Sequence, residues 1–321
     1  MAFALLIFLL LTLTLSQFDG WNLLESVKQI PLWSVALLLV LQIVTQLLVN
    51  FQWYKIAQLA DTPVSFRNMF LINCQGAVID SITPGVKFGG EVTRGVQISR
   101  MGNCSGEQAA ALVAMQKLFS LGAFFLINLF VIGNIVSGAE FLTAIYLQIA
   151  VYAILLFFLL LFLIIFFMPR QLKIYLQKKP SPRFSWMLRT RIFFLTLFDQ
   201  VIAVRKNTKV CAALFLLSLL IWLIYPAKMY LLAVQVFPAA PVMYTGAVTF
   251  ASYMVAMIPV FPGGLGGFEG TMTGLLLTMG LMQSDAYVIT VLFRFVTFWF
   301  VMLFSIVYIV CHKMINKSTI S

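Results

Sequence analysis

Two glycine-rich segments contain the residues whose types and spacing could do chemistry. The first reads TPGVKFGGEVTRG over Thr83–Gly95, and the second reads FPGGLGGFEGTMTG over Phe261–Gly274. The same offset of 178 residues relates five matching positions and also places Gln116 on Arg294. The matching positions are Pro84, Gly85, Gly89, Glu91 and Thr93 with Pro262, Gly263, Gly267, Glu269 and Thr271. We interpret the pair as an internal repeat, with two unrelated proline-glycine turns as the alternative.

Each segment is suited to interrupt a helix and to hold an anion. Proline lacks an amide hydrogen and ends a helix, and glycine lets the backbone turn sharply and approach a ligand closely. Amide groups at the start of the next helix, together with its dipole, favour a phosphate. Neither segment follows a strand or contains GxxxxGK[ST], so a nucleotide-binding fold is not indicated.

Seven charged residues are expected at hydrocarbon depth, where each costs about 2.5–3.5 kcal/mol on insertion scales. They are Asp80, Glu91, Arg94, Lys117, Lys228, Glu269 and Arg294. One interpretation is a phosphate site in which Arg94, Lys117 and Arg294 face the headgroup. The other is internal pairing, Glu91 with Arg94 or Lys117 and Glu269 with Arg294. We expect Lys228, which follows Pro226, to extend towards the outer membrane surface.

A second group of residues could brace the cations or move protons, and its two glutamates could instead be an acid/base pair. This group comprises Glu91, Glu269, Asp80 and Gln116. The predicted headgroup-binding backbone comprises Gly85, Gly89, Gly90, Gly263, Gly264, Gly266 and Gly267. We predict no catalytic residue, no metal and no cofactor. Cys74, Cys104, Cys211 and Cys311 are scattered without a CxxC pair, and His312 is the single histidine.

The elements that must position these residues are membrane-spanning helices. Of 321 residues, 62% are hydrophobic and 10% are charged, against about 25% charged in an average soluble domain. The run Thr143–Met168 has no charge, and Ala109–Ile135 contains Lys117 alone. Because a backbone in lipid must satisfy its own hydrogen bonds, such runs are helices. We predict an all-α, polytopic transmembrane bundle forming one integral membrane domain over 1–321, without a soluble catalytic domain.

The expected helices fall into two halves, about 31–168 and about 210–311, joined by a basic loop over 169–209. The first 16 residues lack the features of a cleaved signal peptide, and we expect a short first helix there. The predicted spans are Ala2–Ser16, Pro31–Phe51, about 107–135, about 141–168, Val210–Val236, Tyr244–Val260 and Ala286–Cys311.

The charges predict the orientation. Ten of the 21 Lys and Arg residues lie between Arg170 and Lys209. The positive-inside rule places this loop and the tail after Cys311 in the cytoplasm, in a plasma or bacterial inner membrane. Consistent alternation then requires 66–106 and 244–282 to be re-entrant hairpins from opposite sides, so the halves are inverted. The basic block lies between apolar spans, so we expect membrane lipids, rather than nucleic acid, as its partner.

These motifs resemble the flippase-like family that forms the transmembrane region of lysylphosphatidylglycerol synthases. The resemblance rests on Pro84-Gly85 to Gly89-Gly90-Glu91 with Arg94 and the following Gln116-Lys117. It also rests on Ile258-Pro259 through Gly263-Gly264-Leu265-Gly266-Gly267-Phe268-Glu269, followed by Arg294. The family often has an acidic residue where this chain has Gln116. The synthase domain of longer members is missing from this sequence.

The resemblance implies lipid translocation, of an anionic or aminoacylated phospholipid or of a polyprenyl-phosphate-linked lipid. Two alternatives remain at this point. One is an intramembrane transferase acting on a lipid-linked substrate, although no DDxxD or DxD cluster is present to hold a metal. The other is an accessory subunit that positions a lipid- or glycan-modifying enzyme through the basic loop. The sequence does not predict the oligomeric state.

Overall fold

The computed structural model describes residues 26, 28–83, 88–131, 145–180, 184–258 and 264–318. Within these ranges the chain is helical with short connections and contains no strand, which confirms the predicted all-α fold. The expected first helix, Ala2–Ser16, lies outside the described residues. So do Pro84, Gly85, Pro262 and Gly263, the centres of the two motifs.

The first half begins with the helices α3 (Leu32–Leu59), α4 (Phe66–Ile82), α5 (Phe88–Met101) and α6 (Gly106–Val131). Helix α3 continues well beyond the predicted end at Phe51, because Trp53 and Ile56 are buried in the core of this half. The Ser65 hydroxyl caps α4 by accepting a hydrogen bond from the Asn68 amide at 3.3 Å. Helix α4 ends before Thr83, whose extended backbone is the conformation favoured before proline.

The predicted basic loop over 169–209 is wrong as a loop, because most of it is helical. It forms α9 (Pro169–Lys178) and α10 (Ser185–Lys206), which follow the apolar helix α8 (Ile145–Phe167). Pro169 occupies the first turn of α9, where a missing amide hydrogen has no cost. Helix α10 buries Leu197, Val201 and Val204 at helical spacing, and it packs on α6.

The second half repeats the order of the first half. A long helix, α11 (Thr208–Val236), precedes two short helices, α12 (Val242–Ala256) and α13 (Gly267–Thr278). Helix α13 therefore begins inside the break predicted at Phe261–Gly270. The last predicted span is divided into α14 (Gln283–Arg294), the π-helical turn η3 (Phe295–Trp299) and α15 (Phe300–Ser318).

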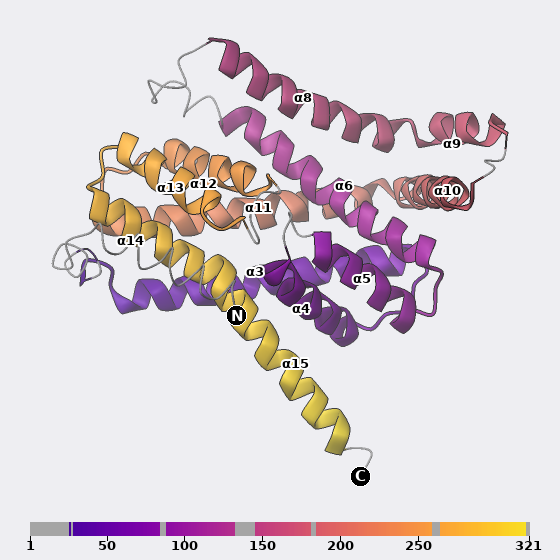
Figure 1. The fold of residues 1–321 in the computed structure, drawn as a ribbon, viewed down its shortest axis with the longest axis horizontal. Helices are drawn as coiled ribbons and strands as arrows, with labels where there is room; N and C mark the ends of the chain where they lie inside the picture. Colours follow the sequence, from indigo (N-terminus) through magenta and orange to yellow (C-terminus); the bar gives the residue numbers. More distant parts are fainter. Residues whose placement is uncertain are drawn as a thin grey trace.

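Five stretches among the described residues are long and apolar enough to cross a membrane. They are Leu32–Leu59, Gly106–Val131, Gln148–Phe167, Thr208–Val236 and Gln283–Ile315. The helix pairs α4–α5 and α12–α13 lie between these stretches in the sequence. In Figure 1 the α12–α13 pair lies towards the left end of the molecule and the α4–α5 pair towards the right.

Helices α3 and α11 pack against each other in antiparallel fashion, and side-chain contacts define their register. Gln52 on α3 contacts Ser218 on α11, whereas Gln42, ten residues earlier on α3, contacts Lys228, ten residues later on α11. The numbering rises along one helix as it falls along the other. The leading helices of the two halves therefore run in opposite directions.

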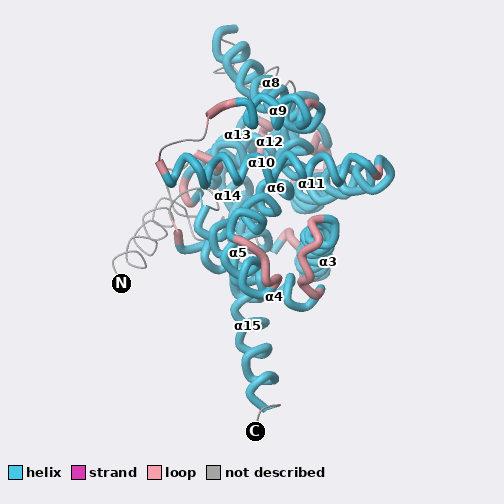
Figure 2. The backbone as a smooth tube through the Cα atoms, turned by 90° about the vertical axis from the view of Figure 1, so that its right-hand side faces the viewer, coloured by secondary structure: helices cyan, strands magenta, loops and turns pink. Residues whose placement is uncertain are grey.

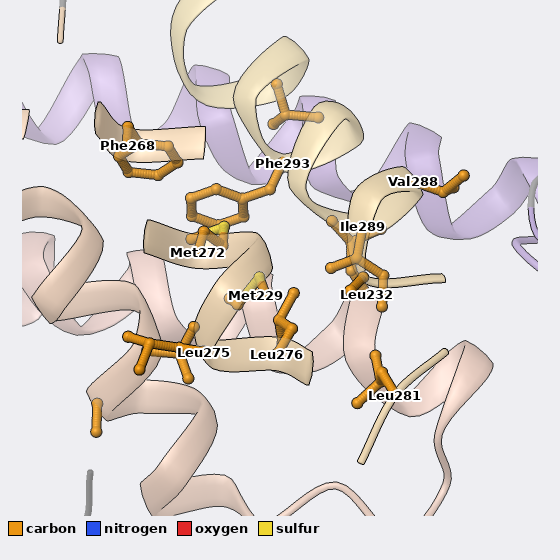
Figure 3. Packing of buried hydrophobic residues seen from close by; sticks show 14 of the residues in the cluster. Met229, Leu232, Phe268, Met272, Leu275, Leu276, Leu281, Val288, Ile289 and Phe293 are labelled. Atoms are coloured by element: carbon orange, nitrogen blue, oxygen red, sulfur yellow. The ribbon is translucent and has the colours of Figure 1, made fainter. Parts of the chain in front are cut away.

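Two large apolar cores, one centred on each half, hold the helices together. The core of the second half packs α11, α13 and α14 around Met229, Leu232, Met272, Leu276 and Phe293 (Figure 3). The core of the first half joins α3, α4, α6 and α10. Helix α15 extends beyond these cores at the lower end of the view in Figure 2. The cores fix the short helix pairs against the long helices, and so position the charged residues.

We predict opposite exposure for the connections that follow the two short helix pairs. In a variant with the four free cysteines changed to serine, Ser105→Cys and Lys178→Cys should react with an impermeant maleimide from one side of sealed vesicles. Met282→Cys should react from the other side, because three crossing helices, α6, α8 and α11, lie between the two connections. Labelling of Ser105→Cys and Met282→Cys from the same side would contradict this arrangement.

Candidate functional site

The first ion cluster lies where α4, α5 and α6 meet, and it consists of Asp80, Glu91, Arg94 and Lys117. The Arg94 Nη1 donates to Asp80 Oδ2 at 3.1 Å and to Glu91 Oε1 at 2.9 Å. The Lys117 Nζ lies 2.6 Å from the same Glu91 oxygen. Two carboxylates and two cations balance, so the cluster can lie within a membrane protein without net charge.

Glycines allow α4 and α5 to approach closely enough for these contacts. A Cβ on Gly90 would lie 2.2 Å from the Asp80 Cγ, and one on Gly76 would lie 2.7 Å from the Arg94 Cζ. The Gly90 amide donates to Asp80 Oδ1 at 2.9 Å, so this carboxylate caps α5 while it pairs with Arg94. Gly89 likewise makes room for the Thr83 side chain. In the structure Gly89 and Gly90 serve helix packing, and their contact with a headgroup stays a prediction.

The second ion cluster, Glu269 and Arg294, joins α13 to α14. The Arg294 Nε lies 2.9 Å from Glu269 Oε1, and the Gly266 amide donates to Glu269 Oε2 at 2.7 Å. The Arg294 guanidinium lies 4.7 Å from the ring centroid of Phe268 and 4.3 Å from that of Phe298. The Arg294 side chain is 7% exposed, so its charge is almost wholly enclosed by the protein.

Backbone conformation before α13 depends on glycine. Gly264 and Gly266 have φ values of +71° and +84°, which side chains other than glycine adopt only with strain. A Cβ on Gly264 would also lie 2.8 Å from that of Ala256. These residues direct the chain from α12 into α13 and bring the Gly266 amide to Glu269. Gly267 is the first residue of α13.

The two clusters share one construction. In each, a glutamate in the first turn of the second short helix pairs with a cation on the helix that follows. The sequence offset matched Gln116 with Arg294, but the cation of the first half is Lys117, one residue later. Gln116 points instead to α3, where its Nε2 donates to Gln52 Oε1 at 3.1 Å. Gln116 is therefore outside the first ion cluster.

A polar face on α3 is the feature that the sequence analysis missed. Gln42, Thr45 and Gln52 are buried, at 0%, 0% and 1% exposure, whereas Val40, Val44 and Leu47 on the other sides of α3 are exposed. The Gln52 Nε2 donates to the Ser218 hydroxyl at 2.5 Å. The spacing of polar residues at 42, 45 and 52 within an apolar span was the available signal.

The prediction that Lys228 extends to the outer membrane surface is wrong. Lys228 is fully buried, and its Nζ donates to Gln42 Oε1 at 2.5 Å and to Thr45 Oγ1 at 3.2 Å. The ammonium also lies 4.5 Å from the ring centroid of Tyr225. Lys228 lies on the side of α11 that faces α3, so its side chain meets polar partners before it could reach the surface.

Buried polar atoms without partners mark the interior as suited to water or a polar ligand. Among the described residues, the Gln116 Oε1 and the Gln42 Nε2 have no hydrogen-bond partner. A buried polar group that is not hydrogen-bonded is costly, and buried sites of this kind are commonly hydrated. Gln42 is part of the polar face of α3, and Gln116 is hydrogen-bonded to Gln52 on that face.

A groove of about 480 Å³ leads to the first ion cluster along α5 and α6. Glu91 lines the groove, as do Gly95 and Ala110. Lys117, which pairs with Glu91, has the most exposed side chain of the cluster, at 32%. The first ion cluster is thus accessible through the groove. Within the described ranges, no group of three or more His, Cys, Asp or Glu is positioned to hold a metal ion.

Fold and site together define a polytopic α-helical membrane protein with paired charges and a polar seam in its interior. The chain matches the family described as lysylphosphatidylglycerol synthase TM region over residues 1–305, and it belongs to that family. This confirms the resemblance drawn from the motifs.

Two archaeal membrane proteins are similar to the chain over most of its length. A UPF0104 membrane protein of Methanocaldococcus jannaschii is 23% identical over 273 residues, covering 82% of this chain and 80% of the relative. A UPF0104 membrane protein of Methanothermobacter thermautotrophicus is 23% identical over 287 residues, covering 83% and 82%. Both comparisons therefore include the two halves rather than one motif.

The packing at Gly90 predicts a specific sensitivity. Gly90→Ala should destabilise the protein by about 1–3 kcal/mol, because the added methyl group would overlap the Asp80 carboxylate. The measurement is the unfolding midpoint in detergent, followed by tryptophan fluorescence. The control is Gly95→Ala on the same helix, where the nearest atom to the new Cβ is 3.8 Å away. Equal midpoints for the two variants would show that the close approach at Gly90 is unimportant.

Proposed function

We propose that the protein transfers a phosphate-bearing lipid from one membrane leaflet to the other without altering it chemically. The cargo class is an anionic or aminoacylated phospholipid or a polyprenyl-phosphate-linked lipid. The observation that carries the proposal is the pair of similarly built ion clusters, one in each half, on either side of a buried polar seam. The name of the family refers to lysylphosphatidylglycerol synthase, which supports a role in lipid metabolism.

The two halves act as inverted repeats in this proposal. The antiparallel packing of α3 on α11 supports it, as do the repeated order of long and short helices and the two crossings between the halves. With α9 and α10 on the cytoplasmic side, α4–α5 enters the membrane from the cytoplasm and α12–α13 from outside. Broken helices at matching positions of inverted halves are the usual place for a transport site.

Exchange of ion partners is the proposed mechanism of headgroup capture. A headgroup phosphate entering the groove replaces the Glu91 carboxylate beside Lys117 and Arg94, so the cations keep an anionic partner throughout. The displaced Glu91 then pairs with the amino group of an aminoacylated lipid or accepts a proton. On the other side of the membrane, Glu269 separates from Arg294, and Arg294 then binds the phosphate.

The polar face of α3 lowers the cost of carrying the headgroup between the clusters. Gln42, Thr45 and Gln52 follow one another along its buried side, and the Lys228 ammonium lies among them. An anion in hydrocarbon would lose its hydration without replacement, whereas amide, hydroxyl and ammonium groups supply substitute partners. The acyl chains remain in lipid, against the apolar outer face of α3.

Lys117 provides a direct test because its loss leaves Glu91 paired with Arg94. In liposomes that contain NBD-labelled phosphatidylglycerol, Lys117→Gln should slow transfer about tenfold or more, as expected from loss of a charge-assisted hydrogen bond. Transfer is measured by dithionite quenching, and an aminoacylated phosphatidylglycerol and a polyprenyl phosphate are assayed beside it. Lys209→Gln removes an exposed charge and serves as the matched control.

Two results would reject the proposal. One is equal transfer by Lys117→Gln and Lys209→Gln when both variants unfold at the same temperature as the unmodified protein. The other is the recovery of chemically altered lipid by mass spectrometry, which would indicate a transferase. Unaltered lipid in the opposite leaflet, formed at a rate that depends on Lys117, is the expected result.

A further inference from the structure

A second, separate cavity of about 330 Å³ lies where α8 ends, α9 begins and α10 ends. Three of its lining residues are the cations Arg170, Arg205 and Lys206, and none is acidic. Asp199, an acidic residue elsewhere on α10, pairs with Lys173 and not with these three. The cavity therefore concentrates positive charge in one half-open hollow, unlike the two ion clusters, whose charges are balanced.

Arg205 is held in a fixed position at the wall of the cavity. Its Nη1 donates to the Phe167 carbonyl at 2.9 Å, and its guanidinium lies 5.5 Å from the ring centroid of Phe167 and 5.8 Å from that of Phe166. This hydrogen bond uses one of the five N–H donors of the guanidinium. A positioned arginine with further donors suits the oxygens of a phosphate. The first turn of α9 also contributes to the wall, and its dipole favours an anion.

The cavity lies at the depth of lipid headgroups. The apolar stretch of α8 ends at Phe167, and that of α11 begins at Thr208, so both ends of the cavity adjoin a membrane boundary. At the N-cap of α10, Phe184 is 62% exposed, and Trp186 and Ile192 on α10 are 62% and 41% exposed. Exposed aromatic and aliphatic side chains on a basic helix are typical of a helix that lies in the membrane interface.

We propose that this cavity binds the phosphate group of an anionic phospholipid in the leaflet that contains the α8–α11 boundary. The lipid is a resident ligand, with its acyl chains beside α8, and not the transported cargo. Arg205 provides the fixed contact, and Arg170 and Lys206 provide the surrounding charge. The site is independent of the proposed transport mechanism, since it shares no residue with either ion cluster.

The test measures binding of a soluble phosphatidylglycerol to the full chain in neutral detergent by native mass spectrometry. The key variant is Arg170→Gln with Lys206→Gln, which leaves Arg205 and its contact with Phe167 in place. The matched control is Lys178→Gln with Arg189→Gln, which removes the same charge from exposed positions of α9 and α10 outside the cavity. Dioctanoyl phosphatidylglycerol is compared with dioctanoyl phosphatidylcholine and with inorganic phosphate.

We expect phosphatidylglycerol to bind the unmodified and control proteins, and to bind the cavity variant about tenfold or more weakly. If the control variant binds phosphatidylglycerol as weakly as the cavity variant, the loss of binding is due to overall charge, and the proposal is overturned. Equal binding of phosphatidylcholine, or competition by inorganic phosphate at the same concentration, would also overturn it. If the double variant does not fold, Arg170→Gln and Lys206→Gln are measured singly. Unchanged binding by both single variants would contradict the proposal.

Discussion

The pairing of charges inside a membrane protein is the constraint on which the structure depends. An unpaired charge at this depth costs several kilocalories per mole, so each buried cation needs a partner that the fold must position. Glu91 and Glu269 meet this need in the same way, each from the first turn of a short helix towards a cation on the next helix. The close approach at Gly90 and the left-handed backbone at Gly264 and Gly266 follow from this requirement.

Paired charges can also exchange partners, and this property connects the fold to the proposed function. In the proposed mechanism, the carboxylate that neutralises Lys117 in the resting protein holds the place that a phosphate takes later. The buried face of α3 then provides amide and hydroxyl groups between the two ion clusters, while its outer face remains apolar. Under the proposed function, α3 separates the route of the headgroup from that of the acyl chains.

The sequence predicted the parts of the fold that follow from local composition. Uncharged runs indicated the spans, whereas the inverted repeat suggested by the offset between Glu91 and Glu269 stays a prediction. The features that the sequence did not predict depend on tertiary contacts. Lys228 is buried because α3 places Gln42 and Thr45 opposite it. Lys117 takes the place predicted for Gln116 because Gln116 faces α3 and Lys117 faces Glu91. The helices α9 and α10 were missed because their charges outweighed the spacing of Leu197, Val201 and Val204.

Accessibility of the buried face of α3 tests the central claim most directly. In liposomes, a cysteine at Thr45 should react with a small, water-soluble methanethiosulfonate reagent added to either side, because the seam between α3 and α11 opens during transfer. A cysteine at Val44, on the lipid-facing side of the same helix turn, should stay unmodified. If both positions are inert while lipid is being transferred, the headgroup does not follow this route, and the account is wrong.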